Sequence, residues 1–213
     1  MKFRIFRTGA LASLLTLAMV QYASGQAGGM NVSPAVGKPL AEAQKLMNAS
    51  PPDYRSALDM VHTAQAVPNR TPTDDYFINQ FLGQIAAATK DNATAAARFE
   101  SVADSPMIEQ DANKPALLQN ALILSTAASH YRKAIGYGAK LSALGPLKHN
   151  IQGYLAVDYY NIHDDAHARD YAQKAVDGAK AAGEQPDPNA ATVLAGLAKS
   201  GTRTVVRKSR KHH

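Results

Sequence analysis

The amino-acid sequence predicts an all-α protein in which about four helical hairpins and one closing helix follow one another along the chain. Three observations favour this fold class. Apolar residues recur with the 3.6-residue period of a helix, alanines recur at the same place in successive stretches, and prolines separate one stretch from the next. The alternating apolar and polar pattern of a half-buried β-strand does not occur in the sequence.

Residues 1–25 are predicted to be a secretory signal peptide. Basic residues precede an apolar run at residues 9–20, small residues follow it, and cleavage is expected after Gly25 or Ala27. The run is shorter than the roughly 20 residues of a membrane-spanning helix, so no transmembrane segment is expected. The lack of cysteine excludes a lipid-anchored lipoprotein, disulfide bonds and thiol catalysis. We therefore expect an exported protein with a periplasmic location.

Residues 38–200 are predicted to form one repeat domain, preceded by a disordered linker at residues 26–37. Four of its stretches begin with a polar turn and end at a proline, namely residues 53–68, 91–106, 130–146 and 164–186. Each has an alanine shortly after the turn: Ala57, Ala95, Ala134 and Ala168. The spacings of 38, 39 and 34 residues between these alanines indicate a repeat of about 34 residues, lengthened by insertions at 69–73 and 105–114.

Each of the four stretches is expected to be the second helix of a hairpin. The first helices are expected at residues 39–49, 73–89, 115–128 and 149–162, and the closing helix at 188–200. Prolines support these boundaries, because a proline in the first turn of a helix removes no hydrogen bond. Such prolines are Pro39, Pro72, Pro115 and Pro188, and the prolines that follow helix ends are Pro68, Pro106, Pro146 and Pro186.

The recurring alanines are explained by close packing of paired helices. Where two helices of a hairpin cross at a short distance, only a small side chain fits between them. A larger side chain would overpack the contact and cost about 1–3 kcal/mol. Phe99 is expected to fill the wider gap one turn further along its helix.

These repeats resemble the tetratricopeptide repeat (TPR), a unit of 34 residues with two antiparallel helices. The fourth repeat matches best, with Leu155-Ala156, Tyr159, Ala168, Ala172 and Ala175 at the spacings of the TPR. The second repeat has Leu82-Gly83, Ala95 and Phe99, whereas the first and third match mainly in the second helix, at Tyr54 and Ala57 and at Tyr131 and Ala134. The start of the domain, "GKPLAEAQKLM" and then "AVPNRTPTDDYFINQFLG", is also similar to exported proteobacterial proteins with several TPRs.

The resemblance implies a right-handed superhelix whose first helices line a concave groove for a polypeptide partner. In this register the groove residues are Phe77, Gln80, Gln84, Gln119, Asn120, Ile123, Tyr154, Val157 and Tyr160. Amides and aromatic rings suit a protein segment better than a small metabolite. The alternative is that some of these side chains pack against neighbouring helices. The lysine and arginine clamp of chaperone-binding TPRs is missing from these positions, so capture of a terminal carboxylate is not expected.

We predict no catalytic residue, cofactor or metal, because the sequence has neither a G-x-S-x-G motif nor a glycine-rich phosphate loop. One alternative is an envelope metal-dependent hydrolase that uses the turn "HDDAH", where His163, Asp164 and His167 could hold a metal. The other interpretation of this turn is a polar connection in which Asp164 or Asp165 caps the following helix. His130 in the equivalent turn of the third repeat favours the capping interpretation.

The formal net charge of +6 comes from the two ends of the chain. Of the 23 basic residues, three lie in residues 1–25 and five in residues 202–213, which leaves 15 basic against 17 acidic residues between them. A nucleic-acid partner is not expected, because such binding needs positive charge on a folded face. Residues 201–213 are expected to be a disordered basic tail that attracts an anionic envelope surface, or simply a solubilising end. Its basic residues are Arg203, Arg207, Lys208, Arg210 and Lys211.

The predicted function is that of a non-catalytic periplasmic adaptor, which binds another protein or a peptide segment through the concave groove. A structural spacer in cell-wall or exopolysaccharide machinery is a further alternative to this adaptor, beside the hydrolase.

Overall fold

The structure, a computed structural model, describes residues 30–209 of the 213-residue chain. Within this range nine α-helices and one 3-10 helix follow one another and no β-strand occurs, so the predicted all-α fold is confirmed. The helices are α1 (Pro34–Met47), α2 (Tyr54–Gln65), α3 (Pro72–Ala88), α4 (Asn92–Asp104), η2 (Pro106–Gln110), α5 (Lys114–Ala127), α6 (Tyr131–Ser142), α7 (His149–Asn161), α8 (Asp165–Ala181) and α9 (Pro188–Ser209). The predicted signal peptide lies outside the described residues.

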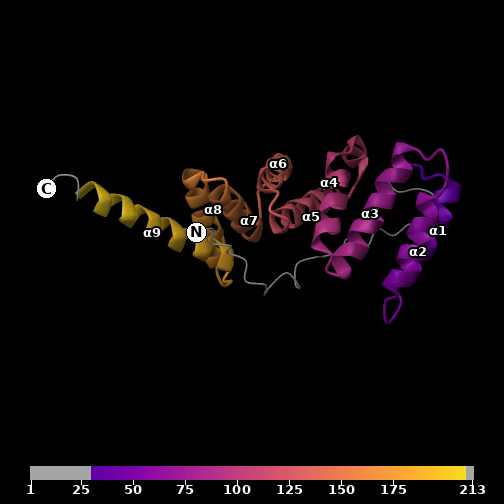
Figure 1. The fold of residues 1–213 in the computed structure, drawn as a ribbon, viewed down its shortest axis with the longest axis horizontal. Helices are drawn as coiled ribbons and strands as arrows, with labels where there is room; N and C mark the ends of the chain where they lie inside the picture. Colours follow the sequence, from indigo (N-terminus) through magenta and orange to yellow (C-terminus); the bar gives the residue numbers. More distant parts are fainter. Residues whose placement is uncertain (1–29, 210–213) are drawn as a thin grey trace.

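The helices form an elongated row that advances in chain order from α1 to α9 (Figure 1). The closest pairs are α1 with α2, α3 with α4, α5 with α6 and α7 with α8, which are the four predicted hairpins. In residues 30–209, every extensive contact between α-helices joins elements one or two places apart in chain order. The fold is therefore helical and repeat-like, with mostly local contacts.

The turns inside three hairpins have the same backbone geometry. Lys90, Ser129 and His163 adopt left-handed conformations with φ of 64°, 65° and 64°. The amide after each of them donates to a carbonyl five residues earlier, in the bonds Asp91 N to Ala86 O, His130 N to Ser125 O and Asp164 N to Tyr159 O. This is the Schellman arrangement, which satisfies the last carbonyls of a helix. Its recurrence shows that the repeat extends to the backbone of the turns.

Buried alanines lie where the helices of each hairpin meet. Ala57, Ala95, Ala134 and Ala168 are all fully buried, as the packing argument requires. Phe99 is also buried and its ring lies over Gly83, where an added Cβ would be 3.0 Å from the ring. One apolar cluster runs from α1 to α7 and a second, rich in alanine, joins α7, α8 and α9.

The N-terminal boundary differs from the prediction, because α1 begins at Pro34 and Pro39 lies inside it. Residues 30–37 are therefore not a disordered linker. The Ser33 amide donates to Asp74 Oδ1 at 2.8 Å, and Met30 and Val36 are buried in the core. Asp74 also forms the capping box of α3, and one carboxylate thus fixes both helix starts. The sequence pattern could not reveal this contact, because the partners are 41 residues apart.

The C-terminal boundary also differs, because α9 continues to Ser209 instead of ending near residue 200. Residues 201–209 of the predicted disordered tail are therefore helical. No proline follows Pro188 in this segment, and Gly201 alone does not stop the helix. In Figure 1 the end of α9 extends beyond α8, away from the other helices.

The predicted insertion at residues 105–114 forms η2, which packs on α3, α4 and α5. Its Ile108 is buried. The Asp111 carboxylate next to η2 accepts hydrogen bonds from Tyr76 Oη at 2.9 Å and Gln80 Nε2 at 3.0 Å. The insertion is thereby fastened to α3 and is part of the folded array.

Two glycines of α6 provide a matched test of close helix packing. Gly136 is exposed and an added Cβ would meet no atom within 4 Å, whereas a Cβ at Gly138 would lie 2.6 Å from Leu155 Cδ2. We expect Gly136→Ala to raise the free energy of unfolding by about 0.5–1 kcal/mol, because alanine favours the helix. Gly138→Ala gains the same propensity but overpacks the buried Leu155, so we expect a net loss of about 1 kcal/mol. Urea denaturation measures both, and equal stabilisation would contradict the close approach of α6 to α7.

Candidate functional site

The nine predicted groove residues fall into a buried set and a partly exposed set. Phe77 and Gln80 have no exposed surface, and Gln84, Asn120 and Ile123 are 8 %, 5 % and 3 % exposed. The partly exposed residues are Gln119, Tyr154, Val157 and Tyr160. The three predicted residues of α3 are thus interior side chains in this structure, whereas all three predicted residues of α7 reach the surface.

Contacts inside the fold account for the position of two of the α3 side chains. Gln80 donates to Asp111 beside η2, and the ring of Phe77 meets that of Tyr76 edge-on at 5.4 Å. Burial and the Asp111 carboxylate raise the pKa of Tyr76 above its usual range. For Phe77 and Gln80, packing in the interior is therefore the role that the structure supports.

Tyr154, Val157 and Tyr160 form a stripe along α7, here called the α7 stripe. An added Cβ at Gly196 of α9 would lie 2.8 Å from Tyr160 Oη, so this tyrosine crosses α9 at a residue without a side chain. Burial, and secondarily the charge of Asp187, raise the pKa of Tyr154. The α7 stripe thus lies where α7 meets α9 and the segment before it.

The "HDDAH" turn is a capped helix start. Asp164 is the N-cap of α8, and its carboxylate accepts from the His167 amide at 3.2 Å and contacts His167 Nδ1 at 2.7 Å. The hydrogen bonds from His167 lower the pKa of Asp164. The imidazole of His167 also stacks on Tyr159 at 4.9 Å. The capping interpretation is confirmed for Asp164, and no group of three His, Cys, Asp or Glu residues suited to a metal occurs within the described range.

A buried glutamate connects the second hairpin to the third, and the sequence analysis did not identify it. Glu100 of α4 is 5 % exposed. Its Oε1 accepts from Ser125 Oγ at 2.8 Å and contacts His130 Nδ1 at 2.6 Å, and its Oε2 accepts from Lys133 Nζ at 2.7 Å. Burial favours the neutral acid, but these hydrogen bonds outweigh it and lower the pKa of Glu100. The Glu100 carboxylate of α4 forms an ion pair with Lys133 of α6 and also contacts Ser125 of α5 and His130 before α6. This network, here called the Glu100 network, therefore holds three helices together.

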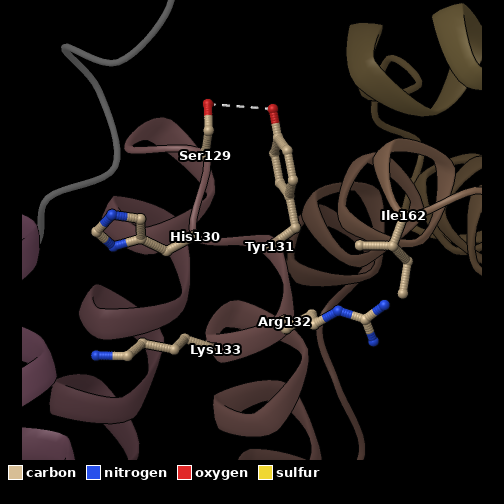
Figure 2. Close-up of a pocket in the computed structure, with 6 residues that line it drawn as sticks. All are labelled: Ser129, His130, Tyr131, Arg132, Lys133 and Ile162. Atoms are coloured by element: carbon tan, nitrogen blue, oxygen red, sulfur yellow. Dashed lines mark hydrogen bonds between the residues drawn. The ribbon is translucent and has the colours of Figure 1, made fainter.

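A surface hollow of about 610 Å³ lies beside this network, between the turn before α6 and the end of α7. Figure 2 shows its six lining residues, with His130 and Lys133 directed away from Arg132 and Ile162. His130 stands where the other hairpins have an aspartate cap (Asp53, Asp91 and Asp164), so no side chain caps α6. Arg132 is exposed and has no hydrogen bond or ion pair among the described residues. Arg132 is therefore the one cation of this lining without a partner among the described residues, because His130 and Lys133 contact Glu100.

The structure describes the backbone of only part of the predicted basic tail. Arg203, Arg207 and Lys208 belong to the helical backbone of α9, whereas Arg210 and Lys211 lie outside the described residues. Among the helices in residues 30–209, none is long and apolar enough to cross a bilayer.

The ion pairs of Glu100 with Lys133 and of Asp170 with Lys174 have the same N–O distance of 2.7 Å, so they provide a matched test of the Glu100 network. We expect Glu100→Gln to lower the free energy of unfolding by about 1–3 kcal/mol at neutral pH, because a buried charged acceptor is lost. Asp170→Asn breaks the exposed pair with Lys174 and should produce no measurable change. Because hydrogen bonds lower the pKa of Glu100, its contribution should disappear as the pH falls below about 4.5. Denaturation at several pH values measures this, and equal effects of the two variants would contradict it.

Comparison with known proteins assigns no family to the chain. No protein-family model, no curated protein and no solved structure matches it. The structure shows an all-α, repeat-like row of helices, with the partly exposed α7 stripe and a hollow at the start of α6 that Arg132 borders.

Proposed function

We propose that this protein is a periplasmic adaptor with a TPR-like superhelix, and that it binds a polypeptide segment through its concave face without turnover. The observation that supports this most is the elongated row of hairpins in residues 30–209, in which the α-helices pack on helices one or two places away in the chain. Such an array has a large surface for its length, and helical-repeat proteins use that surface to bind extended or helical segments.

The partly exposed part of the proposed binding face is formed by the α7 stripe and Gln119. Tyrosine supplies a large contact area at low entropic cost, with a hydroxyl group at the end for hydrogen bonding. Gln119 can donate or accept, so it suits the backbone of a bound peptide. These properties favour a polypeptide over a small metabolite.

The basic end of the chain supplies a second, weaker contact in this proposal. Arg203 and Arg207 both belong to the helical backbone of α9. Basic residues near an anionic membrane each contribute about 1 kcal/mol, and the attraction fades within about 8 Å at physiological salt. The end of α9 would therefore hold the adaptor near an anionic envelope surface without anchoring it.

Site-specific crosslinking tests the adaptor directly. We would replace Val157 with the photo-crosslinker benzoylphenylalanine in cells, identify the captured protein by mass spectrometry, and purify it. The control position is Leu144, which is 48 % exposed and is the one exposed large apolar side chain in residues 30–199. We expect one partner from position 157 and not from position 144.

Affinity for the purified partner provides the quantitative test. Tyr154→Ala/Tyr160→Ala should weaken binding about tenfold or more, because buried aromatic anchors dominate interface energies. Leu144→Ser should leave the dissociation constant unchanged. Circular dichroism must show that the double variant keeps its helical content. Unchanged affinity of a folded double variant would contradict binding through this face.

A further inference from the structure

Asp158 of α7 is an acidic side chain without contact with water, at the place where α7 meets α5. It is fully buried. Its Oδ2 lies 3.0 Å from Thr126 Oγ1 of α5, and its Oδ1 has no hydrogen-bond partner. An ionised carboxylate in such a place would leave most of its acceptor capacity unused, which is costly in a buried site.

The hydrogen bonds of Thr126 show where a proton is needed. Thr126 Oγ1 is 3.0 Å from the Leu122 carbonyl oxygen and 3.0 Å from Asp158 Oδ2. A hydroxyl group has one hydrogen, so it can donate to only one of these two oxygens. If Thr126 donates to the backbone carbonyl, the second contact is a hydrogen bond only when Asp158 carries a proton and donates it to Thr126. The neutral acid therefore satisfies both contacts at once.

The side chains around Asp158 supply no compensating positive charge. On α7 itself the next residue is Tyr159, and from α8 His167 and Tyr171 stack on the Tyr159 ring at 4.9 and 5.5 Å. The His167 imidazole is paired with Asp164. None of these groups forms a hydrogen bond or ion pair with Asp158.

The other helices packed against α7 bring their charges elsewhere. From α6, Tyr131 and Arg132 border the hollow at Ile162, one turn after Asp158, while Lys133 binds Glu100. The only titratable residue of α5 is Lys114, at the opposite end of that helix from Thr126. From α9, the described side chain Lys199 is exposed. Arg132 is a cation without a partner among the described residues, and no ion pair joins it to Asp158, whose side chain forms its one hydrogen bond there with Thr126.

We propose that the contact between α5 and α7 is proton-linked: Asp158 is held there as a neutral acid, and loss of its proton weakens the junction between the third and fourth hairpins. The hollow is lined by Ser129 and Ile162, which follow Thr126 and Asp158 by three and four residues at the ends of α5 and α7. Alkaline conditions would therefore loosen α7, α8 and α9 relative to the rest of the array. Such a device would operate whether or not the α7 stripe binds a partner.

The direction of the pH effect follows from the protonation of the two states. Burial raises the pKa of Asp158 to about 8 from 3.8, with the Thr126 hydrogen bond acting in the opposite direction. Between these values the folded protein keeps the proton and the unfolded chain has lost it. The contribution of Asp158 to the free energy of unfolding therefore falls as the pH rises from about 4 to about 8. The folding equilibrium constant decreases by up to about tenfold for each pH unit.

Asp158→Asn provides the main test, because an asparagine amide keeps the shape and can donate to Thr126 at every pH. Urea denaturation of the full protein and of the variant would be measured from pH 4 to pH 9. We expect similar stabilities near pH 4 and a growing advantage of the variant up to pH 8, at least about 100-fold in the folding equilibrium constant. The control is Asp177→Asn, an exposed aspartate of α8, whose difference from the parent should not change with pH.

A second measurement keeps the proposal testable if the variant does not fold. The side-chain carboxyl signal of Asp158 in the unaltered protein, followed by carbon-13 NMR, should remain that of a protonated acid at pH 7. A signal that changes near pH 4 would overturn the proposal. So would an Asp158→Asn variant whose stability relative to the parent is the same at every pH.

Discussion

The close contact of paired helices at buried alanines is the constraint on which the rest of this structure depends. Ala57, Ala95, Ala134 and Ala168 bring the helices of each hairpin together, and Gly83 acts in the same way beside Phe99. Gly138 of α6 instead allows a close approach to Leu155 of α7, in the next hairpin. Burial of apolar surface stabilises a fold by roughly 25 cal/mol per Å², and small side chains bury little of it. The array must therefore gain much of its stability where one hairpin meets the next, through larger side chains and through a few buried polar contacts.

A buried or half-buried acid lies at several of these junctions, and its chemical state differs along the chain. Asp74 ties the segment before α1 to α3, and Glu100 ties α4 to α5 and α6. Hydrogen bonds lower the pKa of both, although burial acts against them. Burial raises the pKa of Asp158 at the α5–α7 contact and of Asp187 before α9. Protonation at low pH therefore weakens the contacts of Asp74 and Glu100, whereas loss of a proton as the pH rises weakens those of Asp158 and Asp187.

The local features could be predicted from the sequence and the long-range ones could not. The alanine register and the proline positions identify the hairpins, because they depend on residues close together in the chain. The register predicted a groove on the side of α3 that carries Phe77, Gln80 and Gln84, but it could not show that Gln80 would be bonded to Asp111, 31 residues away. Glu100 was missed because one acidic residue in a helix rich in alanine looks like an exposed position until the facing helices are known. The start of α1 and the extent of α9 were wrong because Pro39 is tolerated inside a helix and Gly201 does not end one.

Native-state hydrogen exchange, read by mass spectrometry for each helix, tests most directly whether the hairpins are separate units coupled only to their neighbours. The cluster of α7, α8 and α9 consists largely of alanine, whereas the cluster around α3 and α4 contains Phe77, Phe81 and Phe99. The amides of α8 and α9 should therefore exchange through partial openings of lower free energy than those of α3 and α4, with boundaries at the turns between hairpins. Exchange of all helices through one global unfolding, with the same free energy throughout, would contradict this account.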